Sequence, residues 1–303
     1  MSVDDYPYLI IGGTTKAGTT SLFKYLADHP DICASSLKET RFFLDQNYPL
    51  PSSNRFSENN IDAYGEFFLE LGKLRVEATP DYLYSKAALN IGNKLANVRF
   101  IFILRDPVDR LVSWFKFAKQ KGMMSQGITF DEYVAMQMGI DITAETPVHL
   151  RALEQGKYCQ YLELFRDKYS KNIFCILFSD LATSPQKVMF DVCGFAEISK
   201  EVYTDYKFTV ENKTVRVKSQ RLEKIYTALR RNFSFALYKY PLFKSILRGP
   251  NRVFKQILNI NKSKALDVKI SDEMLHVLRE FYDEEYKNIF VNEGLQRNKK
   301  SES

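Results

Sequence analysis

The feature of this sequence that most constrains its fold is a short apolar run that ends in glycines and leads into a helix. Residues 8–11 (Tyr-Leu-Ile-Ile) are followed by Gly12 and Gly13, a pattern typical of a strand that is buried on both faces. Residues 19–27 then place apolar side chains at helical spacing, and Pro30 stops the helix. A buried strand that leads directly into a helix predicts a parallel sheet covered by helices.

The alternation of apolar runs and amphipathic stretches continues to about residue 200. Buried strands are expected at residues 98–104 and 173–178, and residues 32–34 form another short apolar segment. We therefore predict the α/β class with a central parallel sheet. Residues 44–60 are rich in Pro, Ser and Asn and predict a long loop near the site. Helices are expected at residues 85–96, 107–119, 130–138, 155–169 and 185–193.

Length and composition indicate a single globular domain over residues 1–303. With 45% hydrophobic and 26% charged residues, the chain differs from disordered, collagen-like and coiled-coil sequences. We divide it into an α/β core at residues 7–200 and a basic C-terminal portion at residues 205–303, whose pattern is helical only and closes with residues 270–290. The four cysteines lack paired spacing, so neither a zinc site nor a disulfide framework is expected.

The sequence also bears on location. The apolar run at residues 8–11 is too short for a signal peptide or a spanning helix, and no uninterrupted run of 18 apolar residues occurs. We therefore expect a cytoplasmic protein, with peripheral membrane contact as a further option.

Positive charge is concentrated in residues 205–264, which hold 15 Lys and Arg against three Asp and Glu, whereas the whole chain has a net charge of +6. Such a local excess predicts contact with an anionic partner. An anionic membrane or polysaccharide is the expected partner, nucleic acid is not expected, and a merely solvated helical face is the alternative.

The first junction between strand and helix reads Gly-Gly-Thr-Thr-Lys-Ala-Gly-Thr-Thr over residues 12–20. A glycine-rich turn that enters a helix presents backbone N–H groups and the positive end of the helix, which together favour a phosphate. The order differs from a Walker A loop, because the lysine precedes the second glycine instead of following it. The candidate phosphate-binding residues are Lys16, Ala17, Gly18, Thr19, Thr20 and Ser21.

A second candidate phosphate site follows the strand at residues 98–104. Arg105 ends this strand, and Pro107 suits the first turn of a helix. Arg105 and Ser113, which lies two helical turns further on, can both face the crevice at the carboxyl ends of a parallel sheet. A guanidinium and a hydroxyl are good ligands for a phosphate, although Arg105 could instead pair with a neighbouring aspartate.

Together these motifs resemble the PAPS-dependent sulfotransferases, most closely the heparan-sulfate-type and bacterial carbohydrate branch. Residues 16–21 are similar to the 5′-phosphosulfate loop of that family, and residues 103–113 to its 3′-phosphate motif. Residues 38–43 (Lys-Glu-Thr-Arg-Phe-Phe) resemble the segment that carries the catalytic glutamate of the branch, which corresponds to Glu39. Residues 77–82 (Glu-Ala-Thr-Pro-Asp-Tyr) resemble a further segment.

The resemblance implies a P-loop-NTPase-like three-layer α/β/α fold and an enzyme that moves the sulfuryl group of PAPS to a hydroxyl or amine. The implied acceptor is a saccharide, a glycolipid or another alcohol, and PAP is the product. Lys16 would stabilise the leaving phosphate and Glu39 would be the general base. No metal is required, because the donor is already activated. The implied substrate residues are Lys38, Glu77 and Tyr82.

Two parts of the chain follow the family pattern less closely. Ala78 stands where several members carry a substrate-contacting lysine. Residues 212–219 are the candidate counterpart of the loop that covers the nucleotide, with Lys213, Arg216 and Lys218 as candidate ligands.

Two other functions are alternatives to this one. A P-loop nucleotide kinase would need a Gly-Lys-Ser/Thr loop and a strand that ends in a magnesium-binding Asp, and the sequence shows neither. A non-catalytic anion-binding protein on the same fold would use residues 205–264 to bind nucleic acid or membrane without turnover, and intact Lys16 and Glu39 argue against it. Sulfotransferases of small phenols and steroids use a histidine base, but none of the three histidines lies in the expected place, and His29 is expected in a surface turn.

Overall fold

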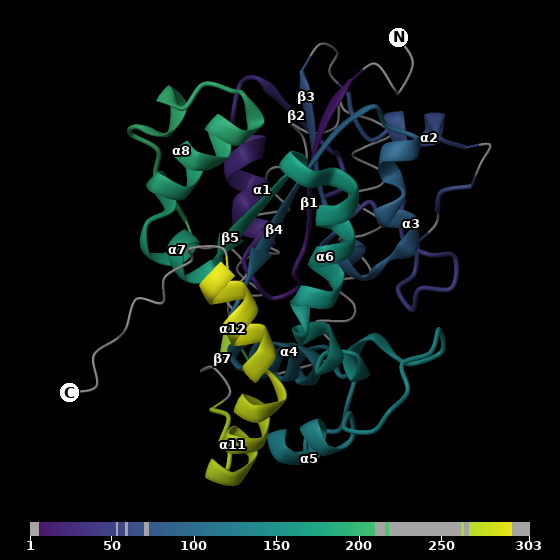
Figure 1. The fold of residues 1–303 in the computed structure, drawn as a ribbon, viewed down its shortest axis with the longest axis vertical. Coiled ribbons are helices and arrows are strands. Elements are labelled where there is room, and N and C mark those ends of the chain that lie inside the picture. Colours follow the sequence, from purple (N-terminus) through teal and green to yellow (C-terminus); the bar gives the residue numbers. More distant parts are fainter. Residues whose placement is uncertain are drawn as a thin grey trace.

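A sheet of five parallel strands, in the order β2-β3-β1-β4-β5, forms the centre of the protein (Figure 1). This computed structural model describes residues 6–52, 54–57, 60–69, 73–209, 216–217, 262–263 and 267–292. The strands of the sheet are β1 (Pro7–Gly13), β2 (Ile32–Ala34), β3 (Leu74–Ala78), β4 (Asn97–Leu104) and β5 (Ile173–Leu177). The α/β class with a parallel sheet, predicted from the sequence, is confirmed.

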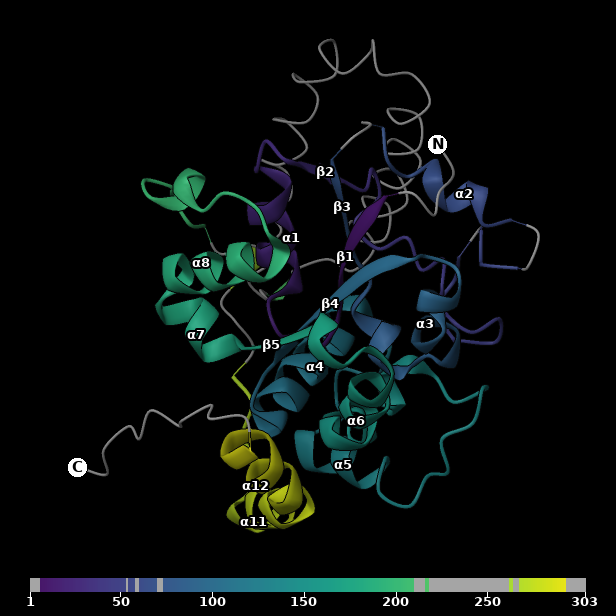
Figure 2. The same ribbon diagram turned by 45° about the horizontal axis from the view of Figure 1, so that its top comes forward.

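Helices cover both faces of the sheet and make the three layers that the resemblance implies (Figures 1 and 2). The side chains of β1 alternate between the two layers: Leu9 and Ile11 face one apolar cluster, and Tyr8 and Ile10 face the other. All four are buried, as the apolar sequence of β1 predicts. One layer contains α1 (Thr19–Ala27), α7 (Phe178–Thr183) and α8 (Pro185–Ala196), and the other contains α2 (Asp62–Gly65), α3 (Lys86–Leu89) and α6 (Tyr158–Tyr169).

A third apolar cluster lies beyond the carboxyl ends of the strands and joins the C-terminal helices to the core (Figure 1). The start of its longest helix is capped, because the Asp106 side chain accepts a hydrogen bond from the backbone N–H of Asp109. Gly122 ends that helix with φ 65°, a conformation that favours glycine. The helices of this cluster are α4 (Pro107–Lys121), α5 (Phe130–Ala135), α11 (Asp272–Phe281) and α12 (Asp283–Asn292).

Short elements complete the described part of the chain. Two two-residue strands, β6 (Arg216–Val217) and β7 (Lys262–Ser263), pair in antiparallel fashion. The prediction that only helices follow residue 205 is therefore wrong for these residues. The 3-10 helices are η2 (Pro80–Tyr84), η3 (Ile91–Asn93), η4 (Val148–Leu150), η5 (Glu154–Gly156), η6 (Ser170–Asn172) and η7 (Glu201–Tyr203).

Strand β3 was not predicted, because Arg75 and Glu77 interrupt its apolar pattern. Both residues are nonetheless buried. The Arg75 guanidinium lies 3.5 Å from the ring centroid of Tyr6 and donates to the hydroxyl of Tyr8, so that its charge has partners inside the protein. Since β3 lies between β1 and β2, the segment at residues 32–34 is an edge strand and not the neighbour of β1.

His29 was expected in a surface turn and is instead only 2% exposed. One ring nitrogen lies 2.7 Å from the carbonyl oxygen of Ser199, and the other accepts the backbone N–H of Asp31 at 3.1 Å. The turn after α1 therefore packs against a segment that lies 170 residues further along the chain, which no local pattern indicates.

The core beside β4 gives a prediction about stability. Phe100 is fully buried and its ring lies 5.9 Å from that of Phe102 and 5.2 Å from that of Phe165. Phe100→Ala should lower the free energy of unfolding by about 3–5 kcal/mol, because it leaves a cavity in this cluster. Leu164→Ala is the control, since Leu164 is 52% exposed on α6 and should change stability by only about 0.5 kcal/mol. Equal shifts in urea unfolding would contradict the packing described.

Candidate active site

The segments that follow β1, β4 and β5 meet at the carboxyl edge of the sheet. The turn after β1 carries Lys16, and Arg105, directly after β4, donates from Nη1 to the backbone carbonyl of Lys16 at 3.2 Å. The Arg105 guanidinium lies 4.7 Å from the ring centroid of Phe178, which begins α7 after β5. Gly18 has φ 89°, and a Cβ there would lie 3.1 Å from the Phe178 ring. Only glycine therefore fits the start of α1 without displacing that ring.

The turn after β1 is tied to the end of β4 by Thr14. Its backbone N–H and its hydroxyl both donate to the carbonyl of Ile103, at 2.9 Å and 3.1 Å. On the other side, the hydroxyl of Tyr158 donates to the carbonyl of Arg105 at 2.8 Å. Lys16 and Arg105 are thus held in fixed relation by hydrogen bonds that involve their own backbone.

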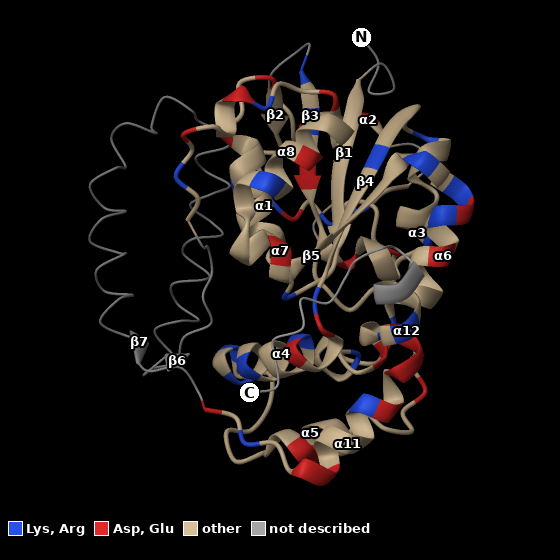
Figure 3. Ribbon diagram, turned by 60° about the vertical axis from the view of Figure 1, so that its left-hand side comes forward, with Lys and Arg blue, Asp and Glu red and all other residues tan. Residues whose placement is uncertain are grey.

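Two other cations, Arg105 and Lys121, act on the charge of Lys16. Burial and the charges of Arg105 and Lys121 together lower the pKa of Lys16 to about 8, while Glu39 acts in the opposite direction. The Lys16 Nζ lies 4.3 Å from the ring centroid of Phe117 on α4. Figure 3 shows basic residues along α4, which passes beneath the sheet in that view. Half-buried cations that repel one another are the expected lining of an anion site.

One face of α4 contributes to this cluster. Ser113, Phe117 and Lys121 are spaced four residues apart and therefore lie on the same side of the helix. Since Phe117 contacts Lys16, this face is directed at the turn after β1, and Ser113 is half-buried one turn from Phe117. Only Ser113 of this face was predicted from the sequence, although the four-residue spacing was a signal that could have indicated Phe117 and Lys121.

The remaining residues of the predicted phosphate loop differ in how accessible they are. Ala17 is fully buried and its backbone N–H donates to the carbonyl of Thr14. Thr19 and Ser21 are 5% and 7% exposed, and the backbone N–H of Ser21 donates to the carbonyl of Gly18. Lys16, Gly18 and Thr20 are half-buried. The residues that line an accessible surface are therefore a subset of those that the sequence indicated.

Glu39 lies between two cations of its own segment. Its carboxylate is 2.9 Å from Arg41 Nη2 and 3.3 Å from Lys38 Nζ, and its side chain is 37% exposed. Burial acts against ionisation of Glu39, but the charges and hydrogen bonds of Lys38 and Arg41 prevail and hold its pKa below the ordinary value. The carboxylate of Glu39 is thus paired with Arg41 as well as with Lys38.

Glu77 and Tyr82, two predicted substrate residues, are 1% and 0% exposed. Thr40 connects them: its hydroxyl donates to Glu77 Oε2 at 2.7 Å and lies 3.2 Å from the Tyr82 hydroxyl, which also accepts the backbone N–H of Phe43 at 3.1 Å. Burial raises the pKa of Glu77 to about 7, although the hydrogen bond from Thr40 opposes this. Direct contact with an acceptor does not fit such burial, and both residues instead support the segment at residues 38–43.

The third predicted group of donor ligands belongs to the basic segment. Lys213 and Lys218 lie outside the described residues, and Arg216 is described only as part of β6. Most of residues 205–264 likewise lies outside them. These assignments stay predictions.

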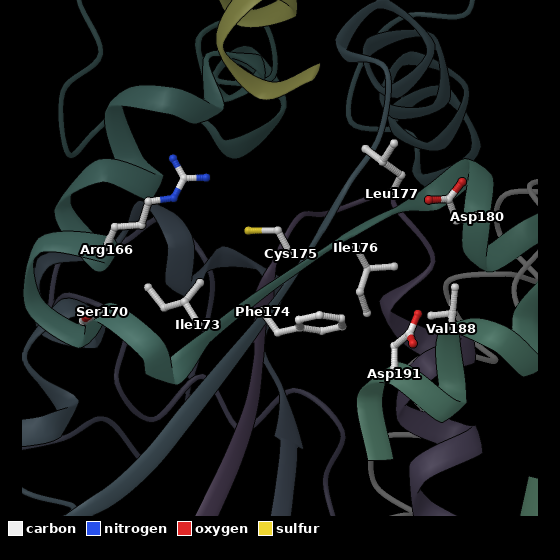
Figure 4. A pocket seen from close by; sticks show the side chains of 10 residues that line it. All are labelled: Arg166, Ser170, Ile173, Phe174, Cys175, Ile176, Leu177, Asp180, Val188 and Asp191. Atoms are coloured by element: carbon white, nitrogen blue, oxygen red, sulfur yellow. The ribbon is translucent and has the colours of Figure 1, made fainter. Parts of the chain in front are cut away.

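A pocket away from this cluster follows the outer edge of β5, between α6 and α8 (Figure 4). Its floor is apolar, with Ile173 and Phe174, and Arg166, Asp180 and Asp191 surround it. It holds none of the residues predicted from the sequence, and we place the candidate site at the cation cluster. Among the described residues, no group of three or more metal-ligating side chains occurs.

Residues 7–232 match the protein family described as the sulfotransferase domain. Among curated proteins, the bifunctional heparan sulfate N-deacetylase/N-sulfotransferase 1 of Xenopus tropicalis is 29% identical over 231 residues, which cover 68% of this chain and 24% of that protein. The membrane-associated sulfotransferase kil1 of Dictyostelium discoideum is 38% identical over 120 residues, which cover 38% of this chain and 23% of that protein. The chain thus spans about a quarter of the length of these relatives.

Two solved structures share the fold. A sulfotransferase from Alicyclobacillus acidocaldarius aligns with a TM-score of 0.55 and 22% identity, covering 74% of this chain and 92% of that chain. The mouse sulfotransferase SULT7A1, solved in complex with PAP, aligns with a TM-score of 0.51 and 13% identity, covering 97% of this chain and 90% of that chain.

The lowered pKa of Lys16 predicts a pH-dependent affinity for anions. A bound anion favours protonated Lys16, so affinity should be lost as the pH rises through about 8. Sulfate keeps its charge over this range, and calorimetry should show its affinity falling about tenfold between pH 7 and pH 9. Lys16→Arg stays charged and should flatten the profile. An unchanged sulfate affinity in the wild-type protein would show that Lys16 does not line the anion site.

Proposed function

The chain belongs to the sulfotransferase domain family, and we propose that it transfers the sulfuryl group of PAPS to a hydroxyl or amine of a saccharide. The observation that carries this proposal is the pair of Lys16 and Arg105 at the carboxyl edge of the sheet, joined by a hydrogen bond. Two fixed cations suit a ligand with two phosphates, and PAPS is such a ligand.

The residues of the cation cluster fit the donor. Sulfuryl transfer, like phosphoryl transfer, asks the protein for positioning and charge stabilisation. Lys16 is assigned to the negative charge that builds on the oxygen between phosphorus and sulfur as the bond to sulfur breaks. Arg105 and Ser113 are assigned to the 3′-phosphate. Burial and the repulsion from Arg105 and Lys121 lower the pKa of Lys16, which supports these roles because a bound anion relieves the repulsion.

Glu39 is the proposed general base, which takes the proton of the acceptor as the new bond to sulfur forms. Its partial exposure and its influence on the pKa of Lys16 support this role. Lys38 is assigned to the acceptor. The segment that carries Lys38 and Glu39 is bound to the sheet, because the backbone N–H of Ala78, at the end of β3, donates to the carbonyl of Lys38 at 3.1 Å.

The acceptor class is proposed from the relatives. The heparan sulfate N-sulfotransferases favour a saccharide, and a glycolipid or another alcohol is the wider class. Lys213, Arg216 and Lys218 are proposed to cover the nucleotide, and residues 205–264 to contact an anionic polysaccharide or membrane. No helix among the described residues is long and apolar enough to cross a bilayer. A cytoplasmic location stays a prediction, and the relative kil1 is named as membrane-associated.

The role of Arg105 can be tested through the choice of donor. Arg105→Ala should weaken PAP binding by about 1.5–3 kcal/mol, the value typical of a hydrogen bond to a charged group, because the 3′-phosphate loses its ligand. Adenosine 5′-phosphate, which lacks that phosphate, should bind nearly as well as before. Calorimetry with both nucleotides measures the difference. Equal losses of affinity for the two nucleotides would show that Arg105 does not bind the 3′-phosphate.

The role of Glu39 can be tested by turnover. Glu39→Gln should retain the fold and PAP binding but lose about 10²–10⁴-fold in turnover, because the amide cannot take the proton. Lys16→Ala should be at least as damaging, since it acts on the leaving group. Glu163→Gln is the control, because Glu163 is exposed on α6. The assay uses radiolabelled PAPS with the acceptor that the wild-type protein modifies in a panel of polysaccharides, glycolipids and alcohols. Near-normal turnover of Glu39→Gln would assign the base to another group.

A further inference from the structure

Helix α12 reaches the segment that carries Arg105, although the two are 180 residues apart in the chain. The hydroxyl of Tyr286 donates to Asp106 Oδ2 at 2.9 Å. The other oxygen of the same carboxylate accepts the backbone N–H of Asp109, at 2.9 Å, at the start of α4. Figure 1 shows α12 next to α4 at this end of the molecule. Because Asp106 directly follows Arg105, an Asp106 carboxylate held from two sides restricts the backbone on which Arg105 sits.

Glu285, the residue before Tyr286, supports the segment around Arg105 through helix α6. Glu285 is only 7% exposed, and its Oε2 accepts the backbone N–H of Cys159 at 2.9 Å, in the first turn of α6. The N-cap residue of α6, Lys157, makes no side-chain cap of its own. A carboxylate from α12 therefore satisfies the positive end of α6. Tyr158, the first residue of α6, then donates its hydroxyl to the carbonyl of Arg105 at 2.8 Å.

Three hydrogen bonds restrain Arg105 and the residue that follows it. The carbonyl of Arg105 accepts a hydrogen bond from α6, and the carboxylate of Asp106 accepts one from α12. The Arg105 guanidinium donates to the carbonyl of Lys16. A guanidinium favours one phosphate position strongly only if its own orientation is fixed. We infer that Glu285 and Tyr286 are positioning residues for Arg105, and that they increase the selectivity of the protein for nucleotides with a 3′-phosphate. This inference rests on the proposed function, which assigns Arg105 to that phosphate.

The selectivity can be measured with two nucleotides and the full chain. Tyr286→Phe removes only the hydroxyl that reaches Asp106, and we expect the affinity for PAP to fall about three- to tenfold. The affinity for adenosine 5′-phosphate should stay the same, because that nucleotide has no 3′-phosphate. Glu285→Gln removes the charge at the start of α6 and should act in the same direction.

A matched control lies four residues earlier in the chain, at the end of α11. The hydroxyl of Tyr282 donates to the carbonyl of Leu153 at 2.6 Å, away from residues 105–106. Tyr282→Phe therefore removes a buried hydrogen bond of the same kind. It should leave the ratio of the two nucleotide affinities unchanged, even if it lowers the stability of the fold.

A double-mutant cycle separates positioning from general stability. In the Arg105→Ala protein, Tyr286→Phe should have no further effect on PAP affinity, because the group that it positions is gone. Equal losses for the two nucleotides, or a loss that persists without Arg105, would show that Tyr286 has a structural role only and would overturn the inference.

Failure of the proposed function would look different. If the wild-type protein does not bind PAP, or if Arg105→Ala binds PAP as tightly as the wild type, the assignment of Arg105 is wrong. If Arg105→Ala loses the preference for the 3′-phosphate while Tyr286→Phe and Glu285→Gln keep it, the assignment of Arg105 stands and the role of α12 is wrong.

Discussion

Parallel pairing of β1 with both β3 and β4 determines where the candidate site lies. Because the strands run in one direction, the segments that follow them leave the sheet at the same edge. The turn after β1 carries Lys16, the segment after β4 carries Arg105, and the end of β3 holds the carbonyl of Lys38. Thr14 connects the first two by donating twice to Ile103. Three segments far apart in sequence thereby present their charged groups at one place.

The positive charges at that edge of the sheet lower the stability of the fold and favour the binding of an anionic ligand. Burial, Arg105 and Lys121 together lower the pKa of Lys16 to about 8, so keeping Lys16 protonated at neutral pH costs free energy in the protein without an anion. A solvated basic face would not show this depression, because water screens its charges. Groups that are unfavourable for folding are common at functional sites, where a ligand compensates for them.

The sequence predicts strands correctly where the buried residues are apolar. It does not where buried charged residues depend on partners far away in the sequence. Strands β1, β4 and β5 are mainly apolar, and their side chains join the apolar clusters on both faces of the sheet. Strand β3 contains Arg75 and Glu77, and the groups that make their burial possible, Tyr8 and Thr40, lie 67 and 37 residues away. Lys121 was missed for a different reason, because its four-residue spacing from Phe117 and Ser113 was a signal within α4 itself.

Two carboxylates, Glu39 and Glu77, are candidates for the proposed general base, and basicity and geometry favour different ones. The pKa of Glu77, raised by burial to about 7, suits a general base at neutral pH, but its side chain is fully enclosed and bonded to Thr40. Glu39 has a lowered pKa, because Lys38 and Arg41 outweigh the effect of its burial, yet its side chain is 37% exposed. Proton transfer requires that the base come within hydrogen-bond distance of the acceptor. Whether a carboxylate can approach the acceptor therefore matters before its pKa does. The proposed function therefore assigns contact with the acceptor to Glu39 and support of its segment to Glu77, whereas the pKa values alone would favour the reverse assignment.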